Sequence, residues 1–177
     1  MLKIPGLLFW LSVLFIFYVY LGYPLILTLL ARLRRKRAEY PSYLPTVTLL
    51  IAAYNEQDVI ASKLENTLAL DYPGENLQII VAADGSDDRT AEIVKRFEPR
   101  GVELSYQPER RCKMASINRA MPQVRNEIVL FSDANNLYNK DTLPELVKPF
   151  SDANVGSVSG SKNMIGSADT LTKSDSL

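Results

Sequence analysis

The chain has 177 residues, and its 20 basic and 20 acidic residues give a formal net charge of zero. It contains no histidine and a single cysteine, Cys112. This composition excludes imidazole metal sites, catalytic triads with histidine, internal disulfides and paired-cysteine metal sites. Any bound metal must therefore be a hard cation held by oxygen ligands, and any general base must be Asp or Glu.

The charges are unevenly distributed. Residues 4–31 contain no charged side chain, and no acidic residue precedes Glu39. Six of the 20 basic residues lie within residues 1–37, so the remainder of the chain has an excess of six acidic residues. An acidic domain is a poor partner for the phosphate backbone of nucleic acids, and we expect no nucleic-acid partner.

Residues 4–31 predict one membrane-spanning helix, because about 20 apolar residues are enough to cross a bilayer. A cleaved signal peptide is the competing interpretation, but small residues would then follow the apolar run, whereas basic residues follow here. Pro24 is a candidate for a kink in this helix. The basic residues after the run predict that the C-terminal part is cytoplasmic. We expect residues 1–37 to be a single-pass anchor in the plasma membrane, with a basic collar.

Residues 38–46 contain two prolines and are typical of a linker. From there to residue 177, short apolar runs rich in β-branched residues alternate with stretches of apolar residues at helical spacing. This alternation predicts an α/β domain, doubly wound, with a mainly parallel sheet and helices on both faces. The predicted strands are Val47–Ala53, Leu77–Ala83, Val102–Tyr106, Ile128–Ser132 and Val155–Ser159. The predicted apolar helix stripes are Val59/Ile60–Leu64–Leu68, Ile93/Val94–Phe97, Met114–Ile117–Met121 and Leu143–Leu146/Val147–Phe150.

Polar residues follow three of the predicted strands. In open α/β sheets, ligands bind beyond the carboxyl ends of the strands, so these residues are the leading candidates for ligand binding. They are Tyr54-Asn55-Glu56 after the first strand, Asp84 to Asp88 after the second and Asp133 to Asn136 after the fourth. A fourth polar segment, residues 110–118, begins the third helix with three positive charges. A helix N-terminus with cations favours a phosphate group.

Asp133 and Asn135 place two oxygen-bearing side chains on the same side of an extended backbone. Such a pair can hold a divalent ion that also binds a diphosphate, and Mg²⁺ or Mn²⁺ suits this role. Lys113 can then neutralise the other side of the diphosphate. Asp84 can accept hydrogen bonds from a nucleobase N–H or a ribose hydroxyl.

Four segments together resemble family 2 glycosyltransferases in order and spacing: residues 47–56, 84–88, 113–118 and 131–135. The resemblance covers roughly residues 46–160. It implies a GT-A fold with a Rossmann-like nucleotide-binding half, and an inverting, metal-dependent transfer from a nucleotide-sugar, commonly a UDP-sugar. The implied acceptor is a glycan or a lipid-linked molecule.

The resemblance also implies roles for individual residues. Asp133 is the first residue of the family's Asp-x-Asp metal motif, and Asn135 departs from that motif because an amide replaces the second carboxylate. Asp133 and Asn135 are therefore the expected metal ligands. The expected nucleotide-sugar-binding residues are Tyr54, Asn55, Glu56, Asp84, Asp87, Lys113, Asn118 and Asp133.

Nothing after residue 160 has the pattern of the family's catalytic base or acceptor half. We therefore expect a donor-binding half whose general base is not identified. Two alternatives stay open: a nucleotide-binding membrane protein without turnover, and an α/β domain with only a structural role.

Each motif taken singly has a simpler explanation. Asn55 with Glu56 favours a helix cap, Asp84 with Gly85 a turn, and the Asp87/Asp88 pair a cap on the following helix. Lys113 alone is typical of solvated surface. Asp133 alone is compatible with a phosphatase-type nucleophile, but that interpretation leaves the other motifs unexplained.

Overall fold

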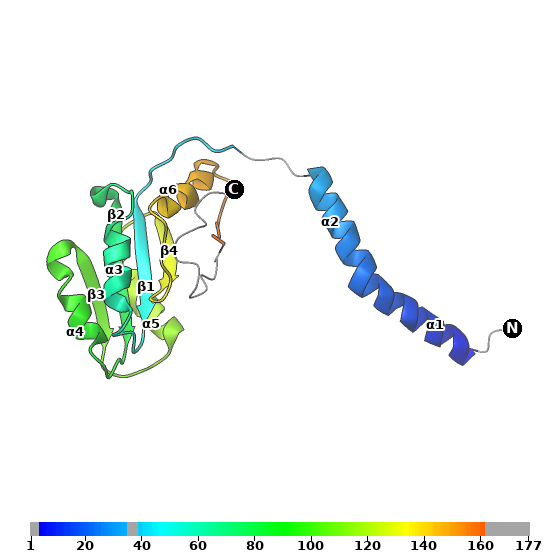
Figure 1. The fold of residues 1–177 in the computed structure, drawn as a ribbon, viewed down its shortest axis with the longest axis horizontal. Helices are drawn as coiled ribbons and strands as arrows, with labels where there is room; N and C mark the ends of the chain where they lie inside the picture. The colour runs from blue at the N-terminus through cyan, green and yellow to red at the C-terminus, as the bar shows by residue number, and fades with distance from the viewer. Residues whose placement is uncertain (1–3, 35–38, 162–177) are drawn as a thin grey trace, which may run out of the picture. The chain divides into compact units, whose positions relative to one another are not determined.

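The computed structural model describes residues 4–34 and 39–161 (Figure 1). The chain divides into two compact units, Met1–Glu39 and Tyr40–Leu177. The first is helical, and the second is an α/β domain. Each unit is described by itself below.

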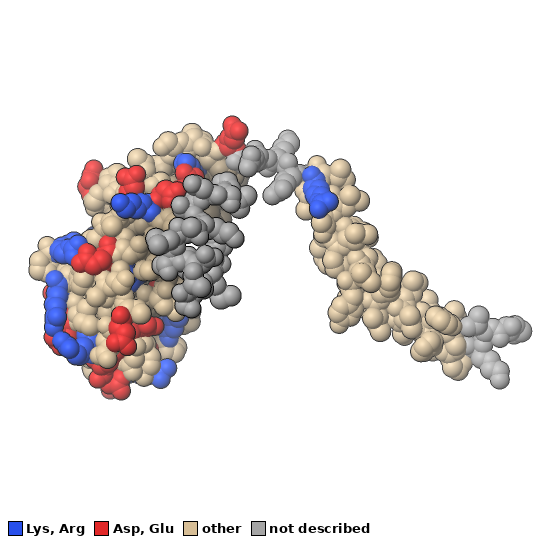
Figure 2. Space-filling view, in the orientation of Figure 1, with Lys and Arg blue, Asp and Glu red and all other residues tan. Residues whose placement is uncertain are grey.

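The N-terminal unit is one long apolar helix. Helix α1 (Ile4–Phe17) continues through a π-helical turn (Tyr18–Gly22) into α2 (Tyr23–Arg34). The stretch Pro5–Leu33 is long and apolar enough to cross a membrane. Figure 2 shows its surface without charge except for basic side chains at its C-terminal end.

The π-helical turn ends at Gly22, two residues before Pro24, where the sequence predicts a kink. Proline has no N–H, so the regular hydrogen-bond ladder cannot continue through this position. The N–H of Tyr23 donates to the carbonyl of Tyr18, five residues back. Pro24 thus coincides with a local change of helix type, one of the recognised causes of helix irregularity.

The second unit is built on a four-stranded parallel sheet with the order β3-β2-β1-β4 (Figure 1). Strand β1 is central, and its first residue, Val47, lies opposite Leu77 of β2 and Ile128 of β4. The first four predicted strands are confirmed, with ends within one residue. Their bounds are β1 Val47–Ala53, β2 Leu77–Asp84, β3 Val102–Gln107 and β4 Ile128–Asp133.

The fifth predicted strand, Val155–Ser159, is wrong. Residues 155–161 form neither strand nor helix, and most of them are exposed. The two valines, Val155 and Val158, are three positions apart, so they cannot face the same side of a strand, which requires spacing of two. Gly156 and the two serines of this segment add no apolar side chain and have weak strand preference.

Helices cover both faces of the sheet, as the alternation predicts. On one face, α3 (Ile60–Leu68) and α4 (Thr90–Lys95) pack against alternate side chains of β1 and β2. The same face continues to α6 (Thr142–Val147), which packs against Val47. On the other face, α5 (Lys113–Ala120) packs against Leu50 and Ile80. Strands β1 and β2 thus have both faces covered, as their apolar composition requires, whereas Phe131 of the edge strand β4 is 55% exposed.

The predicted stripe on α5 is partly wrong. Ile117 is buried as predicted, but Met114 is 62% exposed and Met121 is 37% exposed. The helix instead faces the sheet with Ser116, Ile117 and Ala120. Small residues at two of these positions let the helix approach the sheet closely, and this turns Met114 outward.

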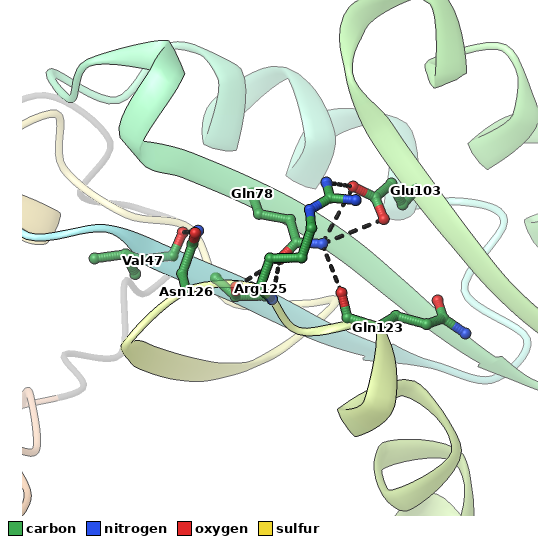
Figure 3. A network of polar contacts seen from close by, with 7 residues as sticks. Val47, Gln78, Glu103, Gln123, Arg125 and Asn126 are labelled. Carbon is green, nitrogen blue, oxygen red and sulfur yellow. Dashed lines mark hydrogen bonds and ion pairs between the residues drawn. The ribbon is translucent and has the colours of Figure 1, made fainter.

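A polar network stabilises the amino end of the sheet, opposite to the carboxyl ends of the strands (Figure 3). The buried amide of Gln78 lies at its centre. Its oxygen accepts hydrogen bonds from the Thr48 hydroxyl at 2.7 Å and the Arg125 N–H at 3.1 Å. Its nitrogen donates to the Gln123 carbonyl at 2.9 Å and to the Glu103 carboxylate at 3.2 Å. Because every donor and acceptor of the buried amide has a partner, the hydrogen bonds offset the cost of its burial, and the network fixes the connection between α5 and β4.

Candidate functional site

A pocket of about 580 Å³ lies where β1, β2 and β4 end and α5 begins. Its volume falls in the range typical of sites for small molecules. Six of the predicted site residues line it: Tyr54, Glu56, Asp84, Lys113, Asp133 and Asn135. The other three, Asn55, Asp87 and Asn118, are exposed and lie outside its lining.

Tyr54 forms the wall of the pocket that follows β1. The guanidinium of Arg110 lies 3.9 Å from the centroid of the Tyr54 ring, a cation–π contact. The contact joins the loop after β1 to the loop before α5, although the two are far apart in sequence. Arg110 thereby brings positive charge to the mouth of the pocket.

Asn55 joins two loops and does not enter the pocket. It has a φ of 52°, a conformation that asparagine tolerates better than most residues. Its N–H donates to the Ser86 hydroxyl, and its side-chain oxygen accepts the N–H of Asp87, both at 3.2 Å. Asn55 therefore fixes the loop after β1 against the loop after β2. The side chains of Asn55 and Glu56 do not cap α3, which begins only at Ile60.

Asp84 is the most deeply buried acidic residue of the pocket, with 3% of its surface exposed. Its two carboxylate oxygens accept the backbone N–H groups of Arg111, at 3.1 Å, and Cys112, at 2.8 Å. Charge-assisted hydrogen bonds of this kind are stronger than neutral ones. In this structure Asp84 fixes the segment that precedes α5, and each oxygen keeps a lone pair for a ligand.

Gly85 allows the loop after β2 to approach the segment before α5. It has a φ of +61°, and a side chain there would meet the backbone of Arg110 at 2.4 Å. Its N–H donates to the Gln107 carbonyl at 2.9 Å. A glycine is therefore required by both conformation and space.

Cys112 has an unusual backbone conformation, with φ 124° and ψ 161°. This region is essentially restricted to glycine, and a residue held there stores strain of about 1–3 kcal/mol. The hydrogen bond to Asp84 holds Cys112 in this conformation, and α5 begins at the next residue. Lys113 consequently enters the pocket from the first position of the helix.

Lys113 and Asp133 form an ion pair across the pocket. Both side chains are about half exposed, so the pair adds little to stability and can exchange for contacts with a ligand. Asn135 lies beside them in the lining. The pocket thus presents one carboxylate, one amide oxygen and an ammonium group near one another.

The donor atoms of this pocket suit a hard divalent cation that takes its other ligands from a diphosphate and water. No group of three or more His, Cys, Asp or Glu side chains forms a metal site among residues 4–34 and 39–161. Asp133 and Asn135 offer two oxygen ligands, and Mg²⁺ in particular is commonly bound through one or two protein oxygens plus phosphates. The residues present therefore fit such an ion.

Six lining residues were not among the predicted site residues: Ala52, Ala53, Arg110, Arg111, Cys112 and Ser116. The positive charge of residues 110–113 was visible in the sequence, but the cation–π contact with Tyr54 depends on a tertiary approach that spacing does not indicate. Asp88 is outside the lining and accepts the N–H of Thr90, the first residue of α4, at 2.9 Å. One of the two predicted capping aspartates therefore does bind the start of that helix.

The fold and the pocket together define an α/β domain with a polar pocket at the carboxyl ends of its parallel strands, and comparison with known proteins identifies its family. The family model described as glycosyl transferase family 2 matches residues 48–177. The chain belongs to this family.

Curated relatives include two enzymes with different products. Poly-beta-1,6-N-acetyl-D-glucosamine synthase of Staphylococcus aureus is 32% identical over 132 residues, which cover 72% of this chain and 31% of that protein. Beta-monoglucosyldiacylglycerol synthase of Trichormus variabilis is 31% identical over 132 residues, with coverage of 72% and 28%. The chain spans less than a third of the length of these relatives.

Solved structures support the same fold. The mannosyltransferase PcManGT from Pyrobaculum calidifontis, in complex with GDP-Man and Mn²⁺, is 33% identical and has a TM-score of 0.71. The match covers 78% of this chain and 43% of that protein. TarS of S. aureus, residues 1–349, is 24% identical with a TM-score of 0.55, covering 59% and 32%, which supports the fold alone.

Proposed function

We propose that this chain binds a nucleotide-sugar in the pocket and, as part of a glycosyltransferase, supports transfer of the sugar to an acceptor. The observation that carries the proposal is that Tyr54, Asp84, Lys113, Asp133 and Asn135 line one pocket at the carboxyl ends of parallel strands. This is where ligands bind in open α/β sheets. The relation to a mannosyltransferase solved with GDP-Man and Mn²⁺ supports it.

A divalent ion, Mg²⁺ or Mn²⁺, is part of the proposal, with Asp133 and Asn135 as its protein ligands. When bound, such an ion neutralises the charge that develops on the leaving diphosphate. Lys113 offers a second positive charge, and the N-terminus of α5 adds partial positive charge from its backbone amides. Asp84 keeps these groups in place through the amides of Arg111 and Cys112, and accepts hydrogen bonds from the nucleoside.

The proposed reaction is an in-line displacement with inversion. An acceptor hydroxyl oxygen bonds to the anomeric carbon, the bond from that carbon to the diphosphate oxygen breaks, and the hydroxyl proton passes to a carboxylate base. We assign no residue as that base. The acceptor is a glycan or a lipid-linked molecule, and both classes of product occur among the names of the curated relatives.

Which nucleobase the donor carries is a separate question. A UDP-sugar is the donor that the family resemblance implies as the common choice, whereas the solved relative at 33% identity holds GDP-Man. UDP and GDP are therefore both needed as probes.

The membrane is the second proposed partner. Pro5–Leu33 is proposed as one span, with the globular unit on the cytoplasmic face. The basic residues that follow the span support this orientation.

Binding without transfer is a second candidate function. Two of the pocket carboxylates are engaged within the chain, Asp84 by two backbone amides and Asp133 by Lys113. An assay of sugar transfer or hydrolysis, beside an assay of binding, separates the two candidates.

Thermal unfolding of the full chain in detergent, with UDP or GDP and with Mn²⁺ or EDTA, tests the proposal. A ligand at about 100 times its Kd should add about 2.7 kcal/mol to the free energy of unfolding, only with the metal present. Asp133→Ala and Asp84→Ala should abolish this rise. Glu145→Ala is the matched control because it removes another exposed carboxylate paired with a lysine, outside the pocket. No rise with either nucleotide in the wild-type chain would overturn the proposal.

A further inference from the structure

Helix α3 carries a lysine in a position that belongs to the core. Lys63 is fully buried, between the core residues Ile60 and Leu64. Burial lowers the pKa of Lys63 to about 8, although the negative charge of Asp133 opposes the shift. A buried ammonium costs several kcal/mol unless it is well partnered, so a lysine here needs a compensating role.

The partners of Lys63 lie in the loop after β4. Its Nζ donates a hydrogen bond of 2.6 Å to the carbonyl of Asn136 and lies 3.8 Å from the centroid of the Tyr138 ring. The contacted segment follows directly after Asp133 and Asn135. We refer to residues 133–138 as the Asp133 loop.

A second polar residue of α3 holds the same loop. Asn66 is one helical turn after Lys63, so both side chains project from the same face. Its side-chain nitrogen donates to the carbonyl of Tyr138 and its oxygen accepts the N–H of Tyr138, both at 2.8 Å. This reciprocal pair satisfies the backbone of Tyr138 as a neighbouring strand would.

The Asp133 loop is consequently held on its inner side by α3. Ala134 is buried in the core that includes Ile60 and Leu64, whereas Asp133 and Asn135 face the pocket. The N–H of Asn136 donates to the carbonyl of Asp133 at 3.3 Å, which closes the turn. Any displacement of Asn136 or Tyr138 would therefore move the two side chains that line the pocket.

We propose that Lys63 and Asn66 are positioning residues, which act through the Asp133 loop to orient Asp133 and Asn135 toward the donor and its metal ion. The inference rests on the proposed function. A purely structural role would be served at least as well by an apolar side chain at position 63, because a well-packed apolar residue avoids the cost of burying a charge. The ammonium instead gives directional contacts to the Asn136 carbonyl and the Tyr138 ring of this loop, which an apolar side chain could not make in the same way.

The experiment measures Mn²⁺-dependent binding of UDP and of GDP to the full chain in detergent, by calorimetry below the unfolding midpoint of every variant. Lys63→Met keeps the length of the side chain and removes its donor. Asn66→Ala removes the reciprocal hydrogen bonds at a less buried position. It remains as the test variant if Lys63→Met does not fold. Leu64→Ala is the matched control, because it removes a fully buried side chain of α3 that packs in the core.

We expect Lys63→Met and Asn66→Ala each to weaken nucleotide binding in Mn²⁺ by at least tenfold, and to raise the Mn²⁺ concentration needed for half-maximal binding. Leu64→Ala should lower the unfolding midpoint by as much or more and keep the affinity within twofold. Affinities of both variants within twofold of wild type, or an equal loss in Leu64→Ala, would overturn the positioning role. A wild-type chain that binds neither nucleotide would instead overturn the proposed function.

Discussion

Gly85 allows the sharpest test of how the pocket is built. An added Cβ would lie 2.4 Å from the backbone nitrogen of Arg110 and 2.8 Å from the carbonyl carbon of Glu109. These are backbone atoms, which cannot rotate away as a side chain would. The positive φ of 61° adds a conformational cost of about 1–2 kcal/mol for a residue such as alanine.

The chain offers a matched control for this perturbation. Gly101 has a φ of +89°, but no atom lies within 4 Å of the position that its Cβ would take. Gly101→Ala should therefore lower the free energy of unfolding by only the conformational cost, about 1–2 kcal/mol. Gly85→Ala adds overpacking of about 1–3 kcal/mol, for a total of about 2–5 kcal/mol.

Thermal unfolding and nucleotide binding should separate these costs. For a domain of this size, the extra loss in Gly85→Ala corresponds to a midpoint roughly 5–10 °C below that of Gly101→Ala. Gly85→Ala should also weaken nucleotide binding, because the shifted Arg110 backbone carries Lys113 with it, whereas Gly101→Ala should bind normally. Equal midpoints and equal affinities in the two variants would refute the close approach of the two loops.

Three further outcomes are expected. Cys112→Gly should raise the free energy of unfolding by about 1 kcal/mol, since glycine relieves the backbone strain, and Cys112→Ala should not; equal midpoints of the two variants would argue against the strain. Gln78→Leu should lower the free energy of unfolding by about 2–3 kcal/mol, because it leaves buried hydrogen-bond partners unpaired, and it should keep the nucleotide affinity. A loss of affinity would show instead that the amino end of the sheet is coupled to the pocket. The cost of burying charged Lys63 is fully present below pH 8 and disappears as the pH rises toward 10.5, because its pKa is about 8 in the folded chain and 10.5 ordinarily. In EDTA, the stability of the wild-type chain relative to Lys63→Met should therefore rise by up to about 3 kcal/mol across that range, and a flat difference in chemical denaturation would contradict the burial of the charge.

Most of the sheet was predictable because its strands are short apolar runs with clear ends. Val47–Ala53 and Leu77–Asp84 are buried on both faces, so their apolar composition alone is enough to predict them as strands. The prediction at Val155–Ser159 fails for a different reason. Two valines among glycine and serine suggest a strand, but the valines are three positions apart and therefore cannot form one buried face of a strand. Met114 was misassigned because helical spacing does not show which side of a helix faces the sheet.

The candidate site was predictable only in part. The residues directly after β1, β2 and β4 could be named, because strand ends meet at one edge of a parallel sheet. Asn55 and Asp87 lie outside the pocket, since they bond to each other across two loops. The contact of Arg110 with Tyr54 and the contact of Lys63 with the Asp133 loop join segments distant in sequence, and spacing alone cannot indicate them.

The strand order has a consequence for the way this domain folds. Val47 pairs with Leu77 on one side and with Ile128 on the other, so the chain loop closed by β4 is close to three times as long as the loop closed by β2. Loop-closure entropy makes the longer closure less favourable by about 0.9 kcal/mol. We therefore expect β1, β2 and β3 to associate first and β4 to join an existing half-sheet. Asp133 arrives with β4, so the ability to bind a donor should be acquired in the last kinetic step, after most of the secondary structure has formed.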